Sequence, residues 1–376
     1  MKSFKVLSSS RPSPHWIRFA AASLLVAAIA GCGGGGNGAN TPITAATNAV
    51  PSTAEASATW KALAPTISNV NVNMGGTTPV VTFAVKDAAG KPLTGLANYS
   101  QSSTARVKAL TNLAFTLAKL VPANATTGEP SKWVNYAVYR PATKAENTAT
   151  PAGSSCEAAT GANWCATYPT SDTQGTLVDN GDGTYQYTFY RDVKQAATIL
   201  ASFTDSADGF YKKADAGDVS YDPTLTHRLG IQLGGAAPGT GSNTPAAVTN
   251  AAYPGVNMVN TANAWYDFRP DGVTVAASRE IVKLASCSTC HDGKVLAHGS
   301  RKDPNYCVTC HTEQIKYGFN GGDAASSNGG LTLTGTTRPT TAIMDGRAIG
   351  NFPNMIHKDA HGQRTGQVRL FLQCSR

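Results

Sequence analysis

The sequence predicts a mainly β N-terminal domain, either a split barrel or a Greek-key sandwich, followed by a domain with little regular secondary structure. Two observations support this fold class. Short alternating or β-branched stretches recur between Gly-, Asn- and Pro-rich loops as far as residue 275. From residue 278 onward the alternation stops, and Cys, His, Gly and Asn dominate. A segment without hydrophobic periodicity needs another source of core, such as a bound cofactor.

The first 31 residues have the pattern of a lipoprotein signal peptide. A basic region is followed by a short apolar stretch at residues 19–29. This stretch leads into the motif Ile-Ala-Gly-Cys, which ends at Cys32 and resembles a bacterial lipobox. We expect Cys32 to be lipidated and to attach the chain to a membrane surface. An ordinary secretory cleavage site with a chance cysteine is the alternative.

The rest of the chain divides by composition into three parts. Residues 32–59 are rich in Gly, Ala, Asn and Thr and predict a flexible tether that begins at the lipidated cysteine. We place the β-rich domain at residues 60–277 and the C-terminal domain at residues 278–376. The expected strands lie at residues 70–74, 80–85, 113–118, 133–138, 183–189 and 227–233. A long surface loop is expected at residues 234–263.

The charge of the chain does not indicate binding to nucleic acid. The formal net charge is +8, but four of the basic residues lie in the predicted signal peptide, where no acidic residue offsets them. Outside this leader there is no Lys/Arg-rich run. The remaining positive charge is small and dispersed, whereas nucleic-acid binding depends on clustered basic residues.

Two C-x-x-C-H motifs, at residues 287–291 and 307–311, carry the predicted chemistry. In this motif two thiols form thioethers with the vinyl groups of one haem, and the histidine that follows ligates the iron. We therefore expect two haem c groups, each with its iron. The expected attachment residues are Cys287 and Cys290 for one haem and Cys307 and Cys310 for the other, with His291 and His311 as proximal iron ligands.

The spacing of the two motifs also fits a zinc ribbon, because C-x2-C-x16-C-x2-C falls within the range of zinc sites. A zinc-stabilised surface-binding protein is therefore an alternative. A histidine follows both cysteine pairs directly, which zinc does not require. The leader also directs the chain out of the cytoplasm, and haem c is attached outside the cytoplasm. These two observations favour haem.

Three further histidines lie in the C-terminal region and are candidates for the distal iron ligands: His298, His357 and His361. Met355 is the alternative distal ligand. Ligation by two histidines leaves no open position on the iron and suits electron transfer, so we expect no catalytic residue. A multihaem reductase with one open iron site is the alternative.

The segments at residues 290–311 and 351–361, with those at residues 131–136, 180–185 and 221–228, resemble the OmcA/MtrC family of outer-membrane decahaem cytochromes. The resemblance implies a split β-barrel domain followed by a c-type multihaem domain. It also implies a lipid-anchored protein of the outer membrane, facing outside, with the periplasmic face as the alternative. It further implies that His298, His357 and His361 are distal ligands.

The same resemblance implies partners and acceptors. These would be other multihaem cytochromes or a porin–cytochrome conduit, with metal oxides, soluble metals or flavins as extracellular acceptors. The chain departs from the family in carrying two haem motifs before residue 376. Cys374 could be the first thiol of a further motif. We therefore expect a truncated member, and a non-functional remnant is a further possibility.

Cys156 and Cys165 form a C-x8-C pair in a Ser-, Ala- and Thr-rich loop of the β-rich domain. Because disulfides persist in exported proteins, we expect the two residues to form one that staples this loop. The resemblance leaves open a redox-responsive role, which C-x8-C pairs have in another domain of the family.

Overall fold

A computed structural model describes much of the chain after residue 62. The described residues are 43–44, 63–100, 102–157, 161–207, 211–237, 256–291, 298–316, 343–344, 347–348 and 350–360. All of them belong to one compact unit, Thr41–Arg376. The expected signal peptide, the lipidation residue Cys32 and nearly all of the tether lie outside the described residues. The expected domain boundary between residues 277 and 278 falls inside this unit and stays a prediction.

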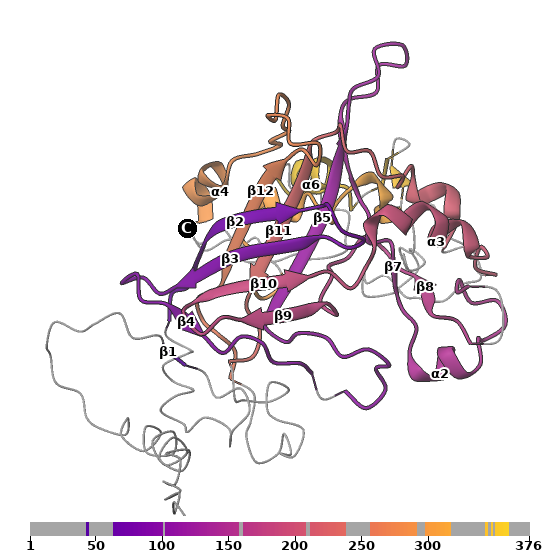
Figure 1. Ribbon diagram of the computed structural model, residues 1–376. Helices are drawn as coiled ribbons and strands as arrows, with labels where there is room; N and C mark the ends of the chain where they lie inside the picture. The colour runs from indigo at the N-terminus through magenta and orange to yellow at the C-terminus, as the bar shows by residue number, and fades with distance from the viewer. Residues whose placement is uncertain are drawn as a thin grey trace, which may run out of the picture. The chain divides into compact units, whose positions relative to one another are not determined.

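Two four-stranded antiparallel sheets dominate the described chain (Figure 1). The first has the order β2-β3-β10-β9, formed by Thr66–Asn73, Val80–Lys86, Thr184–Thr188 and Thr176–Asp179. The second has the order β12-β11-β5-β6, formed by Ala262–Phe268, His227–Leu233, Leu113–Val121 and Lys132–Asn135. In Figure 1, β5, β11 and β12 cross behind β2, β3 and β10. The mainly β architecture predicted for the N-terminal part is confirmed.

Shorter elements connect and flank the sheets. The remaining strands are β1 Ile43–Thr44, β4 Leu93–Thr94, β7 Tyr139–Pro141, β8 Trp164–Ala166, β13 Ile343–Met344 and β14 Arg347–Ala348. The α-helices are α2 Lys144–Thr148, α3 Ala196–Ser202, α4 Leu284–His291, α5 Pro304–Cys307 and α6 Phe352–Ala360. The 3-10 turns are η1 Val193–Gln195, η2 Lys213–Ala216 and η4 Glu313–Lys316. Among the described helices, none is both long enough and apolar enough to cross a membrane.

Aromatic side chains fill the core between the two sheets. Because side chains alternate along a strand, Tyr185 and Tyr187 of β10 point to the same face. Tyr187 stacks on Phe115 of β5, with 3.8 Å between ring centroids, and Tyr185 stacks on Phe83 of β3 at 5.4 Å. All four side chains are at most 2% exposed. The Tyr185–Phe83 contact lies within the first sheet, whereas burial and the Tyr187–Phe115 contact hold the two sheets together.

One expected strand ends earlier in the structure than the sequence predicts. The stretch 133–138 reads as a continuous strand, but β6 ends at Asn135. The reason is local: the side-chain oxygen of Asn135 accepts a hydrogen bond from the backbone N–H of Ala137 (2.7 Å). A side chain that binds its own backbone two residues on favours a turn.

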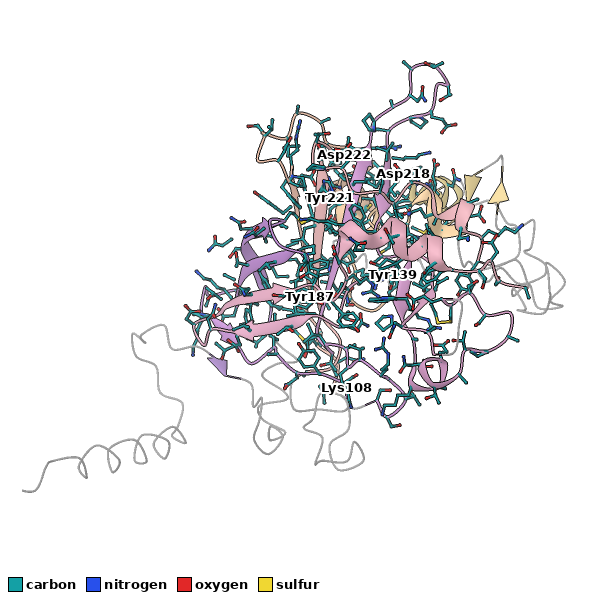
Figure 2. All side chains as sticks on the ribbon, turned by 45° about the vertical axis from the view of Figure 1, so that its right-hand side comes forward. Lys108, Tyr139, Tyr187, Asp218, Tyr221 and Asp222 are labelled. Atoms are coloured by element: carbon teal, nitrogen blue, oxygen red, sulfur yellow. A yellow bond between two sulfur atoms is a disulfide. The ribbon has the colours of Figure 1, made fainter. Side chains whose placement is uncertain are left out.

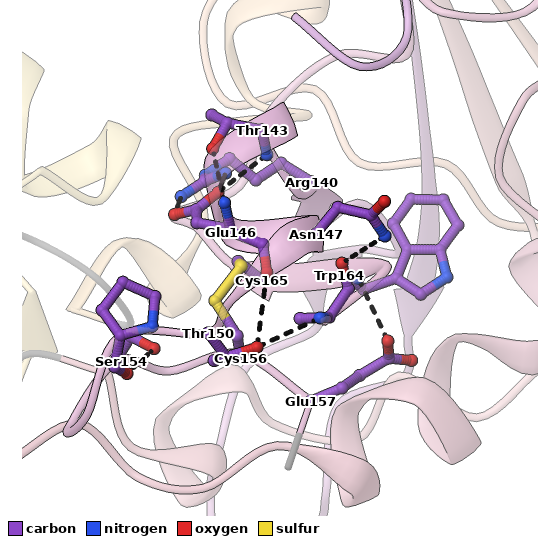
Figure 3. The surroundings of a disulfide bond; sticks show 12 residues. Arg140, Thr143, Glu146, Asn147, Thr150, Ser154, Cys156, Glu157, Trp164 and Cys165 are labelled. Carbon is purple, nitrogen blue, oxygen red and sulfur yellow. Dashed lines mark hydrogen bonds and ion pairs between the residues drawn. A yellow bond between two sulfur atoms is a disulfide. The ribbon is translucent and has the colours of Figure 1, made fainter. Parts of the chain in front are cut away.

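Cys156 forms a disulfide with Cys165 of β8, the short strand that pairs with β7 (Figure 3). Both residues are 2% exposed. Helix α2 lies beside them and begins with a capping box formed by Thr143 and Glu146. Glu146 also pairs with Arg140 at 2.7 Å. The disulfide therefore lies in a loop that is also fixed by an ion pair and a capped helix.

A buried histidine lies at the start of β11 on the second sheet. His227 is 0% exposed, and its Nε2 atom is 2.7 Å from the Tyr136 hydroxyl. Its Nδ1 atom is 2.9 Å from the carbonyl oxygen of Leu225. Tyr221 lies against its ring, close to Asp218 and Asp222 in the segment before β11 (Figure 2). Burial lowers the pKa of His227 to about 4.

This lowered pKa predicts acid sensitivity. At neutral pH His227 is neutral in both the folded and the unfolded chain, so no stability is lost there. As the pH falls from 6.5 toward 4, only the unfolded chain binds the proton readily, so the free energy of unfolding decreases by roughly 3 kcal/mol. A His227→Gln variant should lack this part of the decrease. Urea unfolding at pH 7, 5.5 and 4 tests it, and equal decreases in both proteins would contradict the assignment.

Candidate functional site

The second C-x-x-C-H motif begins on the short helix α5. The side chain of Asp303 caps this helix by accepting a hydrogen bond from a backbone N–H of the first turn (2.8 Å), and proline follows it. The turn continues past the helix, because the backbone N–H groups of Cys310 and His311 both donate to the carbonyl of Cys307. Residues three and four positions apart on a turn share one face. Both thiols and the imidazole are therefore presented together, as attachment of one haem requires.

Thr309, the residue directly before Cys310, is anchored in the second sheet. Thr309 is 0% exposed, and its hydroxyl donates to the hydroxyl of Thr116 on β5 (2.8 Å). The side-chain amide of Asn135 donates to the carbonyl of Thr309 (2.7 Å). Gly230 on β11 makes room for Tyr306, since a Cβ atom there would lie 2.8 Å from the tyrosine ring. The sheet thus holds one side of the motif.

A glutamine just after the motif extends this anchorage. Gln314 is 3% exposed, and its side-chain oxygen accepts from the backbone N–H of Asn135 (2.7 Å). Its side-chain nitrogen donates to the carbonyl of Asn135 (3.0 Å) and to that of Ala216 (2.6 Å). The amide therefore pairs with the backbone at the end of β6 much as a neighbouring strand does. Residues on both sides of His311 are tied to the same point of the sheet.

An arginine on β11 joins the sheet to α5. Arg228 is 0% exposed and makes two hydrogen bonds to the carboxylate of Asp267 (2.7 and 2.8 Å). Another of its nitrogens donates to the side chain of Asn305 on α5 (2.9 Å). The guanidinium lies between the rings of Trp133 and Trp265, 4.5 and 4.6 Å from their centroids. Its charge is therefore compensated, and its role is to hold the helix against the sheet.

The structure brings the two predicted histidines His298 and His311 together. The Nδ1 atom of His311 is 3.0 Å from the carbonyl of Gly350, which leaves Nε2 for a metal. His298 and Gly299 both have a positive φ, 52° and 75°, a tight reversal of the chain that is uncommon for a non-glycine residue. The two imidazole centroids are 6.0 Å apart. Two imidazoles on opposite sides of one metal, each bonded at about 2 Å, require a centroid separation of roughly 6 Å. The spacing fits ligation of one haem iron.

The protonation states of these residues also fit a haem site. Burial lowers the pKa of His311, and burial followed by the charge of Arg301 lowers the pKa of His298. Both imidazoles are therefore neutral at pH 7, which is the form that ligates iron. Burial raises the pKa of Cys307 to about 12 and also raises that of Cys310. Before haem attachment both thiols stay protonated.

A pocket lies beside His311. It is lined by Lys132, Trp133, Arg279, Ile281, Val308, His311, Thr312, Glu313, Asn351 and Pro353. Asn351 is 7% exposed, and its side-chain oxygen is buried without a hydrogen-bond partner within the described part of the chain. An unsatisfied buried polar atom is costly, which is consistent with a group that completes the site.

The alternative distal ligand Met355 lies in a hydrophobic cluster. Its side chain packs, partly buried, against a group of residues that includes Val308 and Phe352. Methionine often fills irregular gaps in this way. This packing between α6 and the second sheet accounts for Met355 without a metal bond.

The first motif and several predicted residues are described only in part. Helix α4 contains the first motif, and the Cys287 side chain is partly exposed. The side chains of Cys290, His291 and His357, and the whole of His361 and Cys374, lie outside the described residues. Their assigned roles stay predictions.

The residues that anchor the second motif were not predicted from the sequence: Asn135, Arg228 and Gln314. One signal was available, since an arginine within the apolar stretch 227–233 needs a buried partner. The two amides gave no comparable signal, because asparagine and glutamine are common at strand ends and in loops.

The anchorage by Asn135 can be tested by local stability. An Asn135→Ala variant loses the side-chain bond to Thr309 and should weaken docking of the motif by about 1–3 kcal/mol. Backbone amides of residues 305–314 should then exchange hydrogen at least tenfold faster, measured by mass spectrometry. The matched control is Asn124→Ala, whose side chain accepts an exposed hydrogen bond in the tip of the β5–β6 hairpin. Unchanged exchange in Asn135→Ala would show that the sheet does not hold the motif.

Comparison with known proteins gives one curated sequence relative. No family model matches the chain. The multihaem cytochrome MtrC of Shewanella baltica (strain OS185) is 29% identical over 210 residues, which cover 55% of this chain and 23% of MtrC. The chain therefore matches less than a quarter of the length of this relative.

Two crystal structures are also similar. That of MtrC from Shewanella baltica OS185 has a TM-score of 0.38 at 23% identity, and covers 67% of this chain and 30% of MtrC. That of the outer membrane decahaem cytochrome OmcA has a TM-score of 0.36 at 22% identity, and covers 68% and 31%. Both scores are too low to support a comparison of the folds. Over the matched 210 residues, this chain is similar in sequence to a multihaem cytochrome of the OmcA/MtrC family.

Proposed function

We propose that this chain is a c-type cytochrome that carries electrons, lipid-anchored at the outer membrane and passing them toward extracellular acceptors. The observation that supports it most is the second motif. Its two thiols and His311 share one face of a turn, and His298 lies 6.0 Å from His311. We infer that Cys307 and Cys310 bind this haem covalently and that the two histidines ligate its iron.

The residues of the site each have a defined task. When bound, the haem supplies a one-electron couple at its iron. His311 is oriented through Nδ1 by the carbonyl of Gly350, and His298 is directed by its left-handed backbone conformation. Ligation by both histidines would leave the iron no open position for a substrate. The anchorage of Thr309 and Gln314 would hold these two ligands in place against the second sheet.

We extend the same reading to the first motif. Cys287, Cys290 and His291 would hold a second haem, with a distal ligand from His357 or His361. Fifteen residues separate the two motifs, so the two haems would be near neighbours that exchange electrons. Metal oxides, soluble metals or flavins are the acceptor classes we propose. Other multihaem cytochromes or a porin–cytochrome conduit are the proposed electron donors.

A haem count tests this proposal. Protein matured in a host that attaches haem c should give two haems per chain in a pyridine haemochrome assay. The reduced protein should show low-spin bands and no carbon monoxide adduct. The double variant Cys307→Ala with Cys310→Ala should retain one haem, whereas the exposed control Asn124→Ala should retain two.

Three results would contradict the proposal. Stoichiometric zinc without covalent haem would support the zinc-ribbon alternative. Binding of carbon monoxide to the wild-type protein would indicate an open iron site and a reductase. One haem in the wild-type protein would show that one of the two motifs does not attach haem.

A further inference from the structure

We propose that Arg301, held in place by Gln232, is the fixed positive charge that raises the reduction potential of the haem at the second motif. This inference rests on the proposed function, because it requires a haem attached at residues 307–311. It assigns the change in the reduction potential of that haem to one arginine outside the motif.

Arg301 lies between the two halves of the site. It follows His298 by three residues. His298 and Gly299 both have a left-handed backbone conformation, and the ring of His298 lies near that of His311. Its guanidinium lies 5.8 Å from the ring centroid of Tyr306, the residue that precedes Cys307. The charge is therefore next to the distal-ligand segment and to the start of the motif.

The position of the guanidinium is fixed from two sides. Its Nε atom donates to the side-chain oxygen of Gln232 on β11 (2.8 Å). The side-chain nitrogen of Gln232 in turn donates to the hydroxyl of Ser300 (2.6 Å). The backbone is held as well, because the side-chain oxygen of Asn263 accepts from the N–H of Lys302 (2.7 Å). A guanidinium held in this way stays at a constant distance from the haem proposed at the second motif.

The charge of Arg301 is not neutralised by a carboxylate among the described residues. Four other arginines pair with a carboxylate within 2.9 Å: Arg140, Arg191, Arg228 and Arg269. Arg301, which is partly buried, has only the neutral Gln232 amide as a hydrogen-bond acceptor within the described part of the chain. Its two terminal nitrogens are thus available to the bound group.

The charge of Arg301 lies close to where the haem would be attached, because its guanidinium is beside Tyr306, the residue that precedes Cys307. The oxidised haem carries one more positive charge than the reduced haem. A nearby partly buried positive charge therefore disfavours the oxidised form and raises the potential.

The test is a spectroelectrochemical titration of the two-haem protein. In Arg301→Gln, one of the two haems should shift to a more negative midpoint potential. The expected change is about tenfold in the oxidised-to-reduced ratio at a fixed potential, or about 59 mV for a one-electron couple. Arg301→Lys should keep most of the wild-type potential. Gln232→Glu should shift the same haem in the same direction, because it places a carboxylate beside the unchanged arginine.

The matched control is Arg269→Gln, which removes an arginine already paired with Asp271 and should move neither haem. If the wild-type protein holds no covalent haem, the proposed function fails. If it holds two low-spin haems and Arg301→Gln moves neither potential, or moves both equally, only the present inference is overturned. A shift in Arg301→Gln that is absent in Gln232→Glu also overturns it, because the effect would then come from altered packing.

Discussion

The hydrogen bonds that Asn135 makes at the end of β6 are the constraint on which the proposed haem site depends. Its side chain holds the carbonyl of Thr309 inside the motif, and its backbone pairs with the side chain of Gln314 beyond it. Helix α5 has only four residues, which is too short to be stable in isolation. The order of the motif therefore comes from the sheet.

This arrangement explains several features of the second sheet that a β domain alone does not require. Gly230 leaves space for Tyr306, and Arg228 spans from Asp267 to Asn305 while its charge is compensated. Thr116 presents a hydroxyl inside an otherwise buried strand, where Thr309 binds it. The sheet therefore provides one wall of the site, and the residues that follow His298 lie along the same wall. Arg301, which no described carboxylate neutralises, lies on that wall and has a neutral anchor in Gln232.

The sequence allowed prediction of most strands and of the chemistry of the motif, but not of how the two are joined. Strand β9 was not predicted, and β12 begins at Ala262, inside the loop expected at residues 234–263. Period-two alternation predicted β10 and β11, and an apolar run rich in β-branched residues predicted β3. The spacing of Cys307, Cys310 and His311 is local and is visible in the sequence. The contacts of Asn135 with Gln314 span 179 residues and involve residue types that are common at any strand end, so no local pattern indicates them. The early end of β6 depends on a local hydrogen bond to the Asn135 side chain, and it was unpredicted because asparagine is common at any strand end. The pairing of His298 with His311 was one of several open possibilities, and the positive φ of His298 shows only in three dimensions.

The most direct test of the account is the ligation of the second haem by His298. A His298→Asn variant removes the imidazole but keeps a residue that tolerates a positive φ. Optical spectra and carbon monoxide binding of the reduced two-haem protein would then be compared with those of the wild type. We predict that one of the two haems becomes high-spin and binds carbon monoxide while the other is unchanged. If both haems stay low-spin and bind no carbon monoxide, His298 is not an iron ligand, and the site described around residues 298–316 is not the haem site we propose.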